Sequence, residues 1–147
     1  MDDDEPMPRC IQGGHLRLEG EHDGNSGFDP DEVTRLIGLE PSWKRRRGES
    51  LGADGRPLAA GSSWRIDVAQ RDTTHTEALV RELLDIVEPY ADGMAQARRA
   101  LGLSAGIYIS VIIYDQLSVP QVQFRVSTLR RLAALELWFW CEQDIHF

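Results

Sequence analysis

Residues 28–38 read FDPDEVTRLIG, and this stretch predicts a short amphipathic helix that organises the first half of the chain. Asp29 is a favoured N-cap residue, Pro30 suits the first helical position, and Gly38 can end the helix in a left-handed conformation. The apolar residues of the stretch recur at helical spacing and predict a buried stripe. This stripe consists of Val33, Leu36 and Ile37.

Strands are predicted on both sides of this helix. His15–Glu19 alternates polar and apolar residues, which indicates a strand with one buried side. The stretch that begins at Ser63 has the same alternation, with Trp64, Ile66 and Val68 on one side. Between the helix and this second strand, residues 40–62 form a predicted long loop.

The second half of the chain predicts five further elements, two helices and three strands. Residues 74–101 form a long helix that Pro89 kinks or splits. The nearly all-apolar run from Ile107 to Tyr114 indicates a strand covered on both faces. An alternating strand at 122–125, a helix at 127–135 and a last strand at 137–141 follow.

These elements predict one α+β domain at 10–147, preceded by an acidic disordered tail at 1–9. The order is β-α-β-α-β-β-α-β, with three helices at 29–38, 74–101 and 127–135. Short links between strands favour a mixed or antiparallel sheet of about five strands. Strand–capped helix–strand units at 16–68 and 122–141 suggest a ferredoxin-like or internally duplicated arrangement.

The charge and the N-terminal sequence limit the class of protein. The 147 residues carry a formal net charge of −8, and Asp2, Asp3, Asp4 and Glu5 supply four of the negative charges. Such a balance argues against binding to duplex nucleic acid. The N-terminus lacks a basic, apolar leader, and no stretch reaches the roughly 18 apolar residues of a membrane helix. We therefore expect a cytoplasmic protein that does not bind membranes.

No catalytic or metal-binding motif is present. The chain contains no GxSxG, Walker A, GxGxxG or HExxH sequence. Its four histidines are scattered, and its two cysteines, Cys10 and Cys141, form no CxxC pair. The sequence therefore predicts a protein that is not an enzyme and uses no metal or cofactor.

The helix and the segment after it carry a family resemblance. Asp29-Pro30, Gly38-Leu39 and Pro41-Ser42 match the pattern D-P-x-x-(I/V)-T-x-x-(L/I)-G-(L/I)-x-P-(S/T), which a basic loop and a tryptophan-bearing strand follow. Over about residues 14–146 the chain resembles the bacterial domain-of-unknown-function family 4279, although His146 stands where that family usually has a final tyrosine. The resemblance implies the fold and a bacterial origin, and it brings no activity.

The basic run in the predicted loop is the first candidate site. It consists of Trp43, Lys44, Arg45, Arg46 and Arg47. Guanidinium groups bind phosphate or carboxylate, and an aromatic ring can stack on a base. The alternative is a solvated loop that answers the acidic surface of the protein itself.

The last strand is the second candidate site, because both of its faces are apolar. If Leu137, Phe139 and Cys141 face the helices, Trp138 and Trp140 lie on the other side of the sheet, with residues such as Tyr108 and Tyr114. A large aromatic patch is usually covered. Either the kinked helix at 74–101 covers it, or a second subunit or another protein does.

Two functions therefore remain open. The first is a non-catalytic protein-interaction module that binds a partner protein or itself, as a homodimer; small acidic bacterial domains of this kind are often immunity or accessory proteins, by analogy. The second is a domain that binds a small anion or a phosphate-bearing ligand through the Trp43–Arg47 loop.

Overall fold

A five-stranded mixed sheet with the strand order β2-β3-β1-β4-β5 forms the centre of the structure. The computed structural model describes residues 6–20, 27–49, 51–56 and 61–147. The strands are β1 (Cys10–Gly20), β2 (Trp43–Arg45), β3 (Ser63–Asp72), β4 (Leu103–Ile113) and β5 (Trp138–Ile145). The helices are α1 (Pro30–Ile37), α2 (Thr76–Val87), α3 (Ala91–Leu101) and α4 (Val126–Ala134). The predicted α+β class, with a mixed sheet of five strands, is confirmed.

The predicted ends of the first helix and the predicted break at Pro89 are both present in the structure. The Asp29 carboxylate accepts a hydrogen bond from the Asp31 N–H at 2.9 Å, and Gly38 ends α1 with φ 83°. Pro89 lies in a short 3-10 turn, Glu88–Tyr90, which separates α2 from α3. The predicted long helix is therefore split, as expected from proline chemistry.

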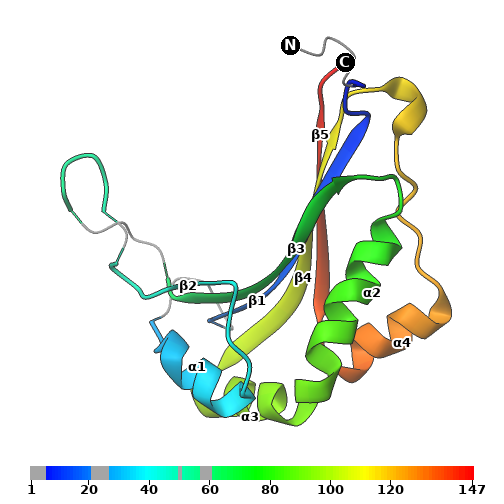
Figure 1. The fold of residues 1–147 in the computed structure, drawn as a ribbon. Helices are drawn as coiled ribbons and strands as arrows, with labels where there is room; N and C mark the ends of the chain where they lie inside the picture. Colours follow the sequence, from blue (N-terminus) through cyan, green and yellow to red (C-terminus); the bar gives the residue numbers. More distant parts are fainter. Residues whose placement is uncertain (1–5, 21–26, 50, 57–60) are drawn as a thin grey trace.

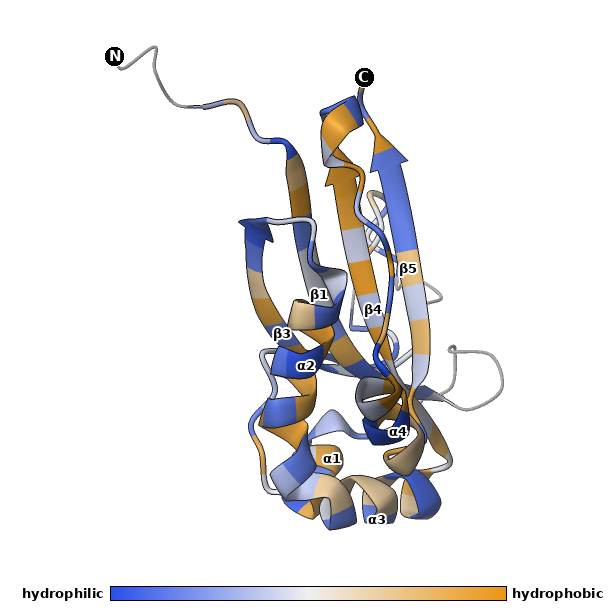
Figure 2. Ribbon diagram, turned by 90° about the vertical axis from the view of Figure 1, so that its right-hand side faces the viewer, coloured by the Kyte–Doolittle hydropathy of each residue, from blue (hydrophilic) through white to orange (hydrophobic). Residues whose placement is uncertain are grey.

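All four helices lie on one side of the sheet, on the outside of its bend (Figure 1). The alternation of the strands explains this arrangement, because every second residue points toward the helices. Along β4 in Figure 2, strongly apolar residues alternate with more polar ones. The large, fully buried side chains of the strands that build this core include Leu16, Leu18, Trp64, Ile107, Ile109 and Ile113.

Two local predictions about strands are wrong. Residues 121–125 form no strand, and instead run as an extended segment toward α4, where Phe124 packs edge-on against Phe139 at 4.8 Å. Val122, the other apolar residue of this stretch, is 41% exposed, so the alternation at 122–125 does not correspond to a buried side of a strand. The reverse error is β2, a strand inside the predicted loop at 40–62, which pairs antiparallel with β3.

The elements from β1 to β4 form a ferredoxin-like arrangement, one of the two arrangements that the sequence suggested. They follow in the order β-α-β-β-α-β, with α2 and α3 in the place of one helix, and their strands lie in the order β2-β3-β1-β4 with every neighbouring pair antiparallel. β2 therefore runs parallel to β1 with β3 between them, and α4 and β5 are added beside β4, with which β5 pairs parallel. The duplicated units predicted at 16–68 and 122–141 are not formed, because residues 122–125 are not a strand. Residues 1–5 of the predicted tail lie outside the described residues, and residues 6–9 precede the first strand.

Within the described residues, no helix is long and apolar enough to cross a membrane.

Candidate functional site

The side of the sheet opposite the helices carries the candidate site, which we call the open face. Its residues alternate along the strands with the buried core residues, and it lies on the inside of the bend of the sheet (Figure 1). In the described part of the chain, no helix covers it. Its principal side chains are His15, Arg17, Glu19, Trp43, Arg45, Arg65, Asp67, Tyr108, Trp138, Trp140 and Glu142.

One row of residues crosses all five strands of this face. The pairing registers place Trp43 opposite Arg65, Arg65 opposite Arg17, Arg17 opposite Gly106, and Gly106 opposite Trp138. Because directly opposite residues in a sheet have neighbouring Cβ atoms, their side chains meet on one surface. The row thus has a tryptophan at each end and two arginines between them.

Stacking joins the members of the row. The guanidinium carbon of Arg65 lies 4.2 Å from the centre of the Trp43 ring, and that of Arg45 lies 5.3 Å from it. The Arg17 guanidinium lies 5.0 Å from the Tyr108 ring centre and 5.7 Å from that of Trp138. These cation–π contacts fix flat groups against the sheet.

Gly106 is the position that allows Trp138 to complete the row. A Cβ atom placed on Gly106 would lie 1.8 Å from the Trp138 ring. The indole therefore occupies the space above the glycine, and any larger residue there must displace it. This requirement explains a glycine in the middle of an otherwise apolar strand.

A second row contains His15 and Tyr108, whose rings stack with their centres 5.2 Å apart. Burial, together with the charges of Arg65 and Arg17, lowers the pKa of His15 to about 4. His15 is therefore neutral at pH 7. The phenol of Tyr108 donates a hydrogen bond to Glu142, and this bond, with burial, raises the pKa of Tyr108.

The centre of the open face holds polar atoms that lack partners. The Nε atoms of Arg17 and Arg65 and the Nε2 atom of His15 are buried, and in the described part of the structure they make no hydrogen bond. Burial, and then the neighbouring charges of Arg17 and Arg45, lowers the pKa of Arg65. Positive charge is thus concentrated between the two tryptophans.

The structure divides the predicted basic run between the two sides of β2. Trp43 and Arg45 lie on the open face, whereas Lys44 pairs with Asp31 at 2.6 Å on the helix side. Arg46 also binds the start of α1, through Asp29 at 2.7 Å and Asp31. Two cations of the run are therefore engaged by the acidic first turn of α1. Arg47 is exposed, and its backbone N–H donates to Ser62 at 3.0 Å.

The predicted aromatic candidates are brought together, with one exception. Tyr108, Trp138 and Trp140 line an open hollow of about 300 Å³ together with Arg17 and Glu19. Trp140 is 61% exposed, so the kinked helix does not cover it. Tyr114 lies beyond the end of β4, where its ring is 5.4 Å from that of His146. It does not belong to this cluster.

Sequence reasoning missed the two arginines that connect the candidates. Arg17 and Arg65 looked like ordinary solvated positions of half-buried strands. The alternation along each strand could have indicated them. Arg65 alternates with the core residues Trp64 and Ile66, just as Trp138 alternates with Phe139, so both lie on the side of the sheet away from the core. Only the strand order shows that both arginines lie between the two aromatic groups.

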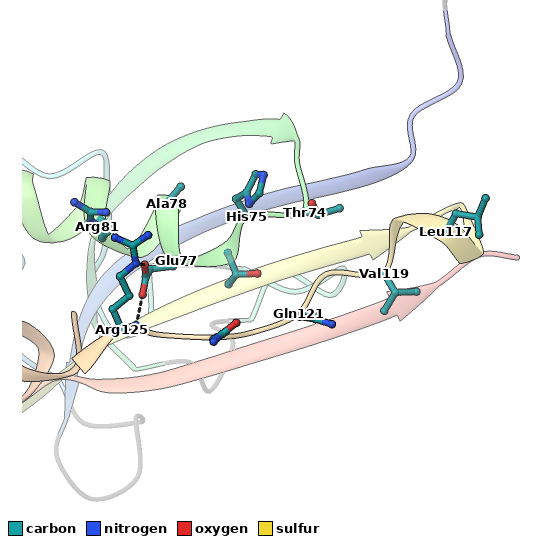
Figure 3. Close-up of a pocket in the computed structure, with 11 residues that line it drawn as sticks. Thr74, His75, Glu77, Ala78, Arg81, Leu117, Val119, Gln121 and Arg125 are labelled. Atoms are coloured by element: carbon teal, nitrogen blue, oxygen red, sulfur yellow. Dashed lines mark hydrogen bonds and ion pairs between the residues drawn. The ribbon is translucent and has the colours of Figure 1, made fainter. Parts of the chain in front are cut away.

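A groove on the helix side is the main competing site. It runs between the first turn of α2 and the segment that precedes α4, and Figure 3 shows Glu77 and Arg125 facing each other across it. The Arg125 guanidinium pairs with Glu77 at 3.8 Å, and the Arg125 backbone N–H donates to the same carboxylate. Its central acid is thus bound by the chain itself, and the lining carries no stacked aromatic group.

The open face presents aromatic rings and guanidinium groups. Within the described residues, no cluster of three or more histidine, cysteine or acidic side chains could hold a metal ion. Burial raises the pKa of both cysteines, Cys10 and Cys141, which disfavours the reactive thiolate form. What the face offers is stacked aromatic surface and guanidinium donors.

Comparison with known proteins identifies the family. A family model described as a domain of unknown function (DUF4279) matches residues 13–146, nearly the whole chain. The chain belongs to this family, which confirms the resemblance seen in the sequence. The searches of curated proteins and of solved structures gave no match.

Proposed function

We propose that this DUF4279 domain is a bacterial, cytoplasmic, non-catalytic interaction module that binds another protein chain through its open face. The observation that carries the proposal is the row of tryptophan and arginine side chains across all five strands. Tryptophan, tyrosine and arginine are the residues that contribute most to binding at protein interfaces.

The exposure of aromatic side chains on the open face supports the same function. Trp140 is 61% exposed and Trp43 is 37% exposed, on a surface that no described helix covers. Large aromatic side chains gain free energy when a partner removes them from water. A flat or gently curved sheet can bury the roughly 800 Å² per partner that a stable interface needs.

A second copy of the chain is the partner that can be tested directly, by sedimentation velocity over a range of concentrations. We expect a dimer for the natural chain and a monomer for the double variant Trp138→Ser, Trp140→Ser. The matched control is Val126→Ser, Leu129→Ser, because these α4 residues are 61% and 49% exposed on the helix side. A natural chain that stays monomeric at high concentration removes the second copy as partner.

A second candidate function is the binding of a small anion or a phosphate-bearing ligand. The buried Nε atoms of Arg17 and Arg65, which lack partners, favour it, and Arg45 extends the positive surface toward Trp43. The two functions differ in the anion that the arginines bind, which is a carboxylate of a protein or a small anion such as phosphate. Titration with both kinds of ligand distinguishes them.

A further inference from the structure

Arg17 and Arg65 form a like-charged pair on neighbouring strands. They are directly opposite each other in the β1–β3 register, in the middle of the open face. Like charges at opposite positions destabilise a sheet unless something lies between them. An anion bound by both guanidinium groups would remove this repulsion.

The geometry of the pair prepares it for such an anion. Trp43 stacks on Arg65, while Tyr108 and Trp138 stack on Arg17, so each guanidinium is held flat before any ligand arrives. A planar, fixed guanidinium donates two parallel hydrogen bonds to a carboxylate. The Nε donor of each arginine lacks a partner in the described part of the chain.

The surrounding charges limit the size of the anion. Glu19 lies 3.7 Å from Arg17, Asp67 occupies the next open-face position of β3, and Glu142 binds Tyr108. These acids would repel a run of phosphates, as the net charge of −8 also would. A single carboxylate carries one negative charge, so these acids repel it less than they repel a run of phosphates.

We infer that the Arg17–Arg65 pair is a binding site for one carboxylate of a partner protein, an Asp or Glu side chain flanked by apolar residues that pack on Trp43 and Trp138. This inference rests on the proposed function, because it assigns chemistry to the partner of the same face. The flanking tryptophans supply the apolar contact area, and the arginine pair selects the acid.

The test uses the full chain and two capped tripeptides, one with glutamate between two leucines and one with glutamine in its place. Nuclear magnetic resonance reports the tryptophan indole and arginine Nε signals during each titration. We expect the glutamate peptide to bind at least about tenfold more tightly than the glutamine peptide, which equals about 1.4 kcal/mol. We also expect a loss of about fivefold or more in Arg17→Gln and in Arg65→Gln.

Arg46→Gln is the matched control, because Asp29 and Asp31 already hold that guanidinium on the other side of β2. Its affinity for the glutamate peptide should equal that of the natural chain. If Arg65→Gln does not fold, Arg65→Lys keeps the charge without the planar group, and we then expect a partial loss. Equal affinity for both peptides, or an equal loss in Arg46→Gln, would overturn the inference.

A third titration uses inorganic phosphate in place of the peptides. Tighter binding of phosphate than of the glutamate peptide, with the same dependence on Arg17 and Arg65, would overturn the choice of a carboxylate and favour a phosphate-bearing ligand. The carboxylate site can fail while the proposed function stands. A dimer that dissociates in the Trp138, Trp140 double variant, together with equal peptide affinities, would keep the function and reject the carboxylate site.

Discussion

The two faces of the same five strands use aromatic residues in opposite ways. On the helix side, Trp64 is fully buried, and its indole N–H donates to Thr34 of α1 at 3.1 Å. On the open face, Trp140 is 61% exposed. Because neighbouring strand residues alternate between the faces, one chain segment serves both, as Trp64 and Arg65 do. The helix side holds the fold together, and the open face carries the surface that we propose for binding.

Arginine shows the same contrast. On the helix side, Arg131 of α4 is held by Asp85 and Glu88 of the segment that contains α2. On the open face, Arg65 has no ion pair among the described residues, and it lies opposite another arginine. Within the described residues, Arg131 thus has carboxylate partners, whereas Arg65 has none. The following predictions test this difference.

The largest expected effect compares the tryptophans of the two faces. Trp64→Ala should lower the free energy of unfolding by about 3–5 kcal/mol, because it leaves a cavity beneath α1 and removes the bond to Thr34. Trp140→Ala should change it by less than about 1 kcal/mol. Denaturant unfolding at low protein concentration measures both. A comparable loss in the two variants would contradict the division between faces.

The next effect concerns the glycine under Trp138. Gly106→Ala should destabilise the fold by about 1–3 kcal/mol and displace the indole, because the new Cβ would lie 1.8 Å from the ring. Gly13→Ala is the control. Gly13 lies in β1 on the same face of the sheet as Gly106, but a Cβ atom there would meet Gln70 at an ordinary contact distance of 3.5 Å. Unfolding and tryptophan fluorescence report both changes. Unaltered fluorescence in Gly106→Ala would show that the indole does not depend on this space.

The sequence predicted the elements more reliably than the surface they form. Capping chemistry and proline are local, so the bounds of α1 and the split at Pro89 could be predicted from neighbouring residues. The strand order is not local, because it depends on which strands pair across long separations. From the sequence, Trp43 and Trp138 are therefore separate candidates, whereas strand pairing places them in one row.

The errors have the same origin. The three-residue strand β2 has no periodicity of its own, and it exists because β3 offers it an edge. Residues 122–125 alternate between polar and apolar side chains, as a strand does. The position next to β4 in the sheet is nevertheless occupied by β5. The choice between competing partners is a tertiary effect that the propensity of a short segment does not contain.

A smaller effect tests how the helix side fixes β2. Asp29→Ala should destabilise by about 0.5–2 kcal/mol, because the Asp31 N–H loses its acceptor and Arg46 loses one of its two acids. The control is Asp54→Ala, which removes a carboxylate from an exposed turn. Denaturant midpoints compare the two variants. Equal midpoints would mean that α1 does not depend on this cap.

The smallest expected effect returns to the open face and concerns pH. Burial and the nearby arginines hold the pKa of His15 at about 4, below its ordinary value of 6.5. Between these values the unfolded chain binds a proton at this site and the folded chain does not, so the free energy of unfolding should rise with pH from about 4 to 6.5. The contribution should be on the order of 1 kcal/mol, after the solvent screening of a half-buried group is discounted.

His15→Gln should flatten that part of the pH profile and leave the profile above pH 7 unchanged. The groups that face this ring are Tyr108, which stacks on it, and Arg17 and Arg65, which oppose its charge. Arg65→Gln should therefore weaken the pH dependence in the same direction by removing part of that repulsion. A slope that survives in His15→Gln would assign the titration to another group, and the positive potential inferred for the open face would lose this support.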